Sequence, residues 1–143
     1  MQTVLKNKFY EYLRQNNPDI LLALQESTKV TSYITDKVNT VNDLIVELQK
    51  ENKPAYIIEE VCMDALTKEL KPSRYNYICS VLEDEFEFAH EQFRKSGILL
   101  GEVINLMAYC EPAFDEIGFT EENEDNRQLR YAVAGIVDKY LSK

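Results

Sequence analysis

Apolar residues recur every three or four positions along nearly the whole chain, and no segment alternates apolar and polar residues with a period of two. The clearest stripe lies near the end of the sequence, at Leu129, Val133, Ile136/Val137 and Tyr140. This spacing places apolar side chains on one face of an α-helix. The pattern predicts an all-α fold without a sheet: a compact, single-domain bundle of about six helices that spans residues 1–143.

The stripes and the residues that interrupt them set the expected boundaries. Helices are expected at 4–16, 30–48, 54–70, 73–96, 98–110 and 126–141, with short extra turns at 19–24 and 113–117. Pro18 suits the first turn of a helix, and Pro112 is expected either to kink the helix before it or to begin a separate turn. Ser73 and Asn126 have the side chains that cap helix N-termini.

The segment between Ser73 and Gly97 is expected to be the central helix of the bundle. Its apolar stripe runs from Ile78 through Phe86 to Phe93. At about 1.5 Å per residue such a helix is on the order of 30 Å long, the width of a small domain.

The charge of the chain is negative and unevenly distributed. The net charge is −9, and residues 72–143 carry seven basic and 14 acidic side chains. A negative field repels phosphate backbones and anionic membranes, so direct binding of nucleic acid or membrane is not expected. The expected partners are proteins, basic ones among them, and the chain is expected to be a monomer or a homodimer.

The three cysteines, Cys62, Cys79 and Cys110, are widely spaced and lie among apolar residues. They form no zinc-binding pattern and no disulfide framework, so we expect small buried side chains and no cofactor. The first residues have no secretory leader, and no window is apolar enough for a membrane helix. We expect a cytoplasmic protein.

One stretch of the central helix has the spacing of a metal site. Glu87 and His90 form a Glu-x-x-His pair, and Glu83 lies one turn earlier. Carboxylates and imidazoles at this spacing build di-metal sites in helical bundles, but two such helices are required. Since the chain has one histidine, only a symmetric dimer would complete the site. The alternative is an ordinary polar helix flank.

Two other groups of residues are candidates for contacts with a partner. Arg74, Tyr75 and Tyr77 follow Lys71 and combine positive charge with rings that stack on a base or a peptide. The loop after Gly118 carries four carboxylates, from Glu121, Glu122, Glu124 and Asp125, but lacks the glycine of an EF-hand. For each group the alternative is structural: tyrosines packed inward, and a solvated loop.

No catalytic pattern is present. The four glycines form neither a dinucleotide-binding motif nor a phosphate-binding loop, and no nucleophile elbow occurs. The chain is therefore not expected to be an enzyme.

The order and spacing of several short groups resemble those of a known family. These groups are Asn17-Pro18-Asp19, Ala65-Leu66 with Glu69-Leu70, Arg74-Tyr75, Leu82 with Glu85-Phe86, and Cys110-x-Pro112-x-Phe114. Together they resemble a Bacteroidetes family of small helical proteins of unknown function, whose genes often accompany mobile elements. The resemblance implies an all-helical fold and brings no activity, cofactor or catalytic residue.

Three functional hypotheses follow. The favoured one is a non-enzymatic, cytosolic module that works through protein–protein contacts. The second is a di-metal carboxylate protein assembled in a dimer through Glu83, Glu87 and His90. The third is an acidic decoy that occupies the basic surface of a nucleic-acid-binding protein.

Overall fold

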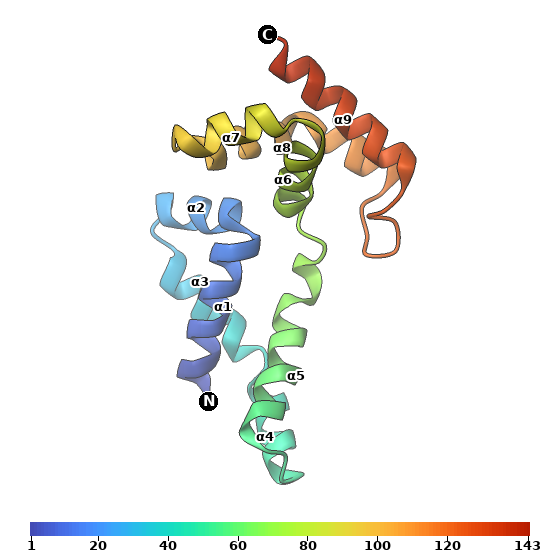
Figure 1. Cartoon of the computed structure of the whole chain (residues 1–143). Helices are drawn as coiled ribbons and strands as arrows, with labels where there is room; N and C mark the ends of the chain where they lie inside the picture. The colour runs from blue at the N-terminus through green and yellow to red at the C-terminus, as the bar shows by residue number, and fades with distance from the viewer. The chain divides into compact units, whose positions relative to one another are not determined.

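Nine α-helices and one short 3₁₀ turn make up the chain, and the computed structural model describes all 143 residues (Figure 1). No strand is present, so the all-α prediction is confirmed. The helices are α1 (Gln2–Asn16), α2 (Pro18–Glu26), α3 (Val30–Asn39), α4 (Asn42–Lys50), α5 (Ala55–Thr67), α6 (Arg74–Glu85), α7 (Glu87–Lys95), α8 (Leu99–Ile117) and α9 (Arg127–Leu141), with the 3₁₀ turn at Lys68–Leu70. None of them combines the length and the apolar character that crossing a bilayer requires.

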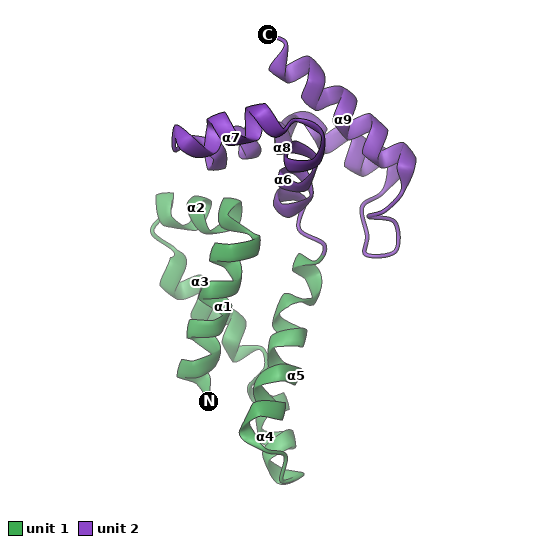
Figure 2. Cartoon of the chain, in the orientation of Figure 1, with its two compact units in different colours: residues 1–71 green, residues 72–143 purple.

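The contacts divide the chain into two compact units, Met1–Lys71 and Pro72–Lys143 (Figure 2). Each unit has its own cluster of buried apolar side chains. In the first unit Leu5, Phe9 and Leu13 of α1 are fully buried, and α1 packs on α3 and α5. In the second unit α8 packs on α6 and α9. The division falls at the Lys71-Pro72 break, and the single-domain expectation stays a prediction.

The structure has nine helices where about six were expected. Two expected helices are each divided, and the short turn expected at 19–24 forms the helix α2. The expected helix 30–48 is interrupted at Thr40 and Val41, whose amides donate to the carbonyls of Lys37 and Val38, three residues back. Its β-branched side chains lower helix propensity. The burial of Val41 in the core then decides where the helix ends.

The expected central helix is divided at Phe86, which has a non-helical conformation with φ −137° and ψ 49°. No Pro or Gly causes this break. Asp84 and Glu85 at the end of α6 are instead held by ion pairs to Arg130 of α9, while Glu87 begins α7, where a carboxylate suits the helix dipole. The ring of Phe86 packs against the second core, and α7 has no buried residue at all. The central helix on which the others pack is therefore not this segment.

The helix termini agree closely with the sequence patterns. The Ser73 and Asn126 side chains accept hydrogen bonds of 3.1 Å from the amides of Asn76 and Leu129. Pro18 is the first residue of α2. Of the two alternatives predicted for Pro112, the separate turn is wrong, because α8 continues through this proline to Ile117. The carbonyl that loses its helical partner belongs to Ala108, an exposed residue that water reaches.

Three helices end in the same way, with a left-handed residue just beyond the helix. This residue is Thr28 after α2, Asn52 after α4 and Gly97 after α7, with φ of 57°, 59° and 74°. In each case the next amide donates to the carbonyl five residues back, as from Ile98 to Phe93 at 3.0 Å. This is the Schellman arrangement, which satisfies carbonyls at a helix C-terminus.

Candidate interaction surface

Helix α7 presents a large apolar side chain to solvent. The Phe88 side chain is 76% exposed, and Phe93 on the same helix is only half-buried. The helix is short and charged, with an ion pair of 2.9 Å between Arg94 and Glu91. It contacts α6 and α8, so its position is set by tertiary packing.

Residues of α7, α8 and α9 line a groove. Its volume is about 630 Å³, and it is lined by Phe88, Ala89, Gln92 and Phe93 of α7, Glu102 of α8, and Tyr140, Leu141 and Lys143 from α9 and the residues after it. A smaller hollow of about 270 Å³ adjoins it, lined by Tyr109, Ile136, Lys139, Tyr140 and Lys143. The two share Tyr140 and Lys143, and we call their combined lining the aromatic groove.

Tyr140 stands at the centre of the aromatic groove. Its hydroxyl donates a hydrogen bond to Oε2 of Glu102. This hydrogen bond, together with partial burial, raises the pKa of Tyr140 above its ordinary value of 10.0, so the hydroxyl remains a donor at neutral pH. The Glu102 carboxylate thus has a fixed partner inside the groove.

Tyr109 forms one wall of the smaller hollow. Its side chain is 52% exposed, and its ring centroid lies 5.3 Å from that of Tyr140. The Nζ atom of Lys143 lies 5.0 Å from the centroid of the Tyr109 ring, within reach of a cation–π contact. The groove therefore offers ring faces, two lysine ammonium groups and one hydrogen-bonded carboxylate, which is the chemistry of a binding surface.

The structure brings together two of the three predicted metal ligands. His90 Nε2 lies 3.5 Å from Glu83 Oε1, and the imidazole side chain is 13% exposed. Glu87 is exposed and pairs with neither of them. No group of three or more His, Cys, Asp or Glu side chains in the chain is placed to hold a metal ion. A site shared by two chains in a dimer stays a prediction.

The predicted basic–aromatic patch does not share one exposed face. Tyr77 is only 8% exposed, and its ring contacts the rings of Phe114 and Phe119, with centroids 5.7 and 5.1 Å away. Arg74 pairs with Asp115 at 3.2 Å and covers the Phe114 ring. Tyr75, two positions before Tyr77 and so on another side of the helix, is half-buried. The Tyr77 ring is therefore a core side chain and is not free to stack on a ligand.

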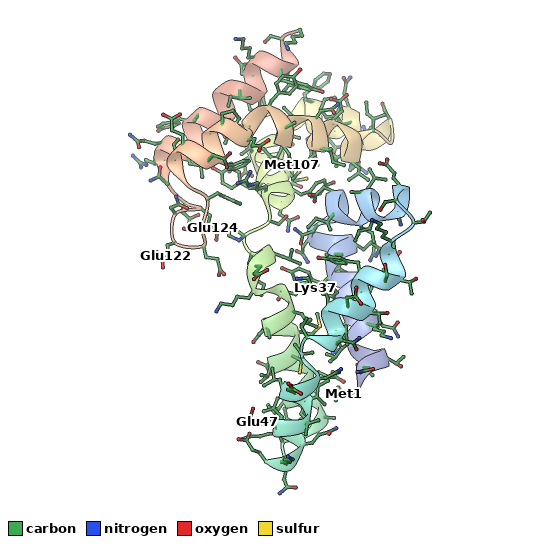
Figure 3. The ribbon with its side chains drawn as sticks, turned by 180° about the vertical axis from the view of Figure 1, so that it is seen from behind. Met1, Lys37, Glu47, Met107, Glu122 and Glu124 are labelled. Atoms are coloured by element: carbon green, nitrogen blue, oxygen red, sulfur yellow. The ribbon has the colours of Figure 1, made fainter.

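The predicted acidic loop exposes all four of its carboxylates, those of Glu121, Glu122, Glu124 and Asp125. Figure 3 shows Glu122 and Glu124 on this loop, between α8 and α9. None of the four forms an ion pair. Phe119, at the start of the loop, packs against the second core and so anchors the loop.

The expectation of buried cysteines is confirmed for two of the three. Cys62 and Cys110 are buried, and Cys79 is half-buried. Burial raises the pKa of both Cys79 and Cys110 to about 11. A thiol in this state is a weak nucleophile at neutral pH.

The sequence reasoning missed the aromatic groove. Phe88 was the available signal, because it falls outside the apolar stripe that joins Phe86 to Ala89 and Phe93. A large apolar residue off the stripe must be exposed if the helix forms. Tyr109 and Lys143 carried no such signal, since their proximity depends on how α8 packs on α9.

Comparison with known proteins adds no assignment to this surface. The chain matches no protein-family model, no curated protein and no solved structure. The resemblance to the Bacteroidetes family therefore stays an expectation.

Proposed function

We propose that this chain is a non-enzymatic module that binds another protein through the aromatic groove. The observation that carries the proposal is the exposure of Phe88 and Tyr109 beside two adjoining hollows. Exposed apolar patches rimmed by polar groups are typical of sites of protein–protein contact.

The residue types of the groove support the same proposal. Aromatic side chains are enriched at the energetic centres of interfaces because they bury a large area and lose little conformational entropy. Tyr140 also combines an apolar ring with a hydroxyl fixed on Glu102, so one side of the groove is already ordered before a partner arrives. Such preorganisation lowers the entropic cost of binding.

The test compares two substitutions at equally exposed aromatic residues. Phe88→Ser alters the groove, whereas Tyr131→Ser alters a residue of α9 that is 68% exposed and does not line it. In affinity purifications quantified by mass spectrometry, we expect a protein recovered with the wild type to be lost with Phe88→Ser and kept with Tyr131→Ser. Repeated recovery of no partner, together with turnover of a small molecule by the purified chain, would contradict the proposal.

The acidic decoy is a second candidate, and one observation favours it. The loop between Gly118 and Asn126 is held in place by its own hydrogen bonds and directs four unpaired carboxylates to solvent. This candidate predicts binding to a basic protein that weakens steeply as salt is added. Neutralising the loop with Glu121→Gln, Glu122→Gln and Glu124→Gln should then abolish binding while Phe88→Ser leaves it unchanged.

A further inference from the structure

The aromatic groove differs in charge from the unit that contains it. Residues 72–143 hold seven basic and 14 acidic side chains. Three of the seven cations, all arginines, are held in ion pairs: Arg74 with Asp115, Arg94 with Glu91, and Arg130 with Asp84 and Glu85. The four cations without an ion pair are Lys95, Arg127, Lys139 and Lys143, and the two lysines nearest the C-terminus line the groove.

The groove has little negative charge of its own. Glu102 is the one side-chain carboxylate that lines it, and the Tyr140 hydroxyl already donates to it. The smaller hollow contains Lys139 and Lys143 and no acidic residue. A chain that is acidic overall therefore presents two ammonium groups without an ion pair beside exposed aromatic side chains.

The structure assigns a partner class to this surface: a short amphipathic segment of another protein that carries large apolar side chains flanked by carboxylates. The inference rests on the proposed function and adds the chemistry of the partner. Apolar side chains of the segment would cover Phe88 and Tyr109, and its carboxylates would meet Lys139 and Lys143. Opposite charges placed at the edge of an apolar contact raise the association rate and fix the register of binding.

A second copy of the chain fits the groove poorly. A symmetric contact whose two-fold axis passes near the smaller hollow would set the lysines of one copy against those of the other, and like charges in contact are unfavourable. The acidic loop of a second copy would supply carboxylates but no apolar side chain, because its one aromatic residue, Phe119, is packed in the core. A segment of a different protein that combines large apolar side chains with carboxylates matches the chemistry of the groove.

Peptide selection on the full chain tests the inference without a known partner. Random peptides of about 16 residues, long enough to form an amphipathic segment, are displayed and selected on the immobilised protein. The enriched peptides are expected to combine aromatic or branched apolar residues with Asp or Glu. Binding of the best peptide is then measured by fluorescence anisotropy, together with a version in which its Asp and Glu are replaced by Asn and Gln.

Two double variants with the same change in net charge separate the effect of the groove lysines on binding from the effect of the chain's net charge. Lys139→Glu/Lys143→Glu reverses both groove cations, and Lys95→Glu/Arg127→Glu reverses the two unpaired cations outside it. We expect the groove variant to bind the acidic peptide about tenfold more weakly or worse than the wild type does. The matched variant should lose less than about twofold in affinity. Circular dichroism checks that both variants keep their helices.

Phe88→Ser distinguishes failure of the inference from failure of the proposed function. If the enriched peptides lose binding with Phe88→Ser but are not acidic, or do not respond to the lysine reversal, the partner class is wrong and the groove still binds protein. If no enriched peptide responds to Phe88→Ser, both proposals fail. Self-association that depends on Phe88, with no acidic peptide enriched, would show that a second copy is the occupant and overturn the inference.

Discussion

The side-chain amide of Asn123 donates a hydrogen bond of 2.6 Å to the carbonyl oxygen of Gly118. The oxygen of the same amide accepts from the backbone amide of Thr120 at 2.6 Å and from its hydroxyl at 3.0 Å. One side chain therefore closes the acidic loop from both sides. It acts together with the backbone hydrogen bonds from Asn123 to Thr120 and from Asn126 to Asn123.

Asn123→Asp should open this loop, because it replaces an amide donor with a carboxylate facing the Gly118 carbonyl. We expect the free energy of unfolding to fall by about 1–2 kcal/mol, the cost of a lost hydrogen bond that leaves a polar group unpaired. Urea unfolding followed by circular dichroism measures the change. Glu124→Gln, an exposed change in the same loop, is the control and should lie within about 0.5 kcal/mol of the wild type. Equal stabilities of Asn123→Asp and Glu124→Gln would show that the amide does not hold the loop.

Thr28→Gly should stabilise the chain, an unusual outcome for a substitution to glycine. Thr28 has φ 57° at the end of α2, where a β-branched residue in the left-handed region costs about 1–2 kcal/mol. We expect thermal or urea unfolding to show a gain of about 1 kcal/mol after the greater flexibility of glycine is subtracted. Asn52→Gly, at the equivalent position after α4, should gain less, because Asn enters this region more easily. A loss on Thr28→Gly would mean that the hydrogen bond from the Thr28 hydroxyl to the Ser27 carbonyl outweighs the strain.

Tyr77→Phe should leave stability unchanged or raise it by up to about 1 kcal/mol. The Tyr77 hydroxyl is buried without a hydrogen-bond partner, and Arg130 lies over the ring, with its Cζ atom 5.8 Å from the centroid. Removing the hydroxyl keeps the ring contacts with Phe114 and Phe119 and removes an unpaired polar group. Tyr77→Ala, which removes the ring as well, should cost about 3–5 kcal/mol in the same urea titration. A loss of more than about 1 kcal/mol for Tyr77→Phe would show that the hydroxyl has a bonded partner in solution.

Asp19→Asn should change how stability depends on pH. Burial raises the pKa of Asp19 above its ordinary value of 3.8. Between that value and the higher folded-state value, the native chain binds more protons than the unfolded chain, so this group lowers stability as pH rises. The Asp19→Asn variant lacks this contribution, and its stability relative to the wild type should increase across the window and then level off.

The measurement is urea unfolding at intervals from about pH 3.5 to about pH 7. Asp43→Asn is the matched control, because Asp43 also occupies the second position of a helix, α4, and is exposed. It accounts for the loss of a carboxylate near a helix N-terminus. If the stability of Asp19→Asn relative to the wild type does not vary with pH, or varies no more than that of Asp43→Asn, then burial does not raise the pKa of Asp19.

Much of the fold was predictable because its signals are local. The apolar stripe of α9 and the caps at Ser73 and Asn126 depend on residues within a few positions of one another, and the structure contains all three. The break at Phe86 was not predictable in this way. At this break the end of α6 is joined to α9 through Arg130, which lies 45 positions from its partner Glu85 in the sequence.

The candidate surface was harder to predict for the same reason. Phe88 is recognisable as an exposed residue once its helix is placed, but the hollow beside it requires Glu102 and Tyr140, which are 38 positions apart. The pair of Glu83 with His90 was accessible, because residues seven apart lie on one helix face. The two side chains still meet across the break at Phe86, with His90 Nε2 3.5 Å from Glu83 Oε1.

The division of the chain at Lys71 and Pro72 has a consequence for the groove. Every residue that lines it, from Phe88 to Lys143, belongs to the second unit and is positioned by that unit's core. All the side chains of the groove are thus encoded in one contiguous half of the sequence. If residues 72–143 fold by themselves, gene fusion or duplication of this half alone would transfer every side chain that lines the groove.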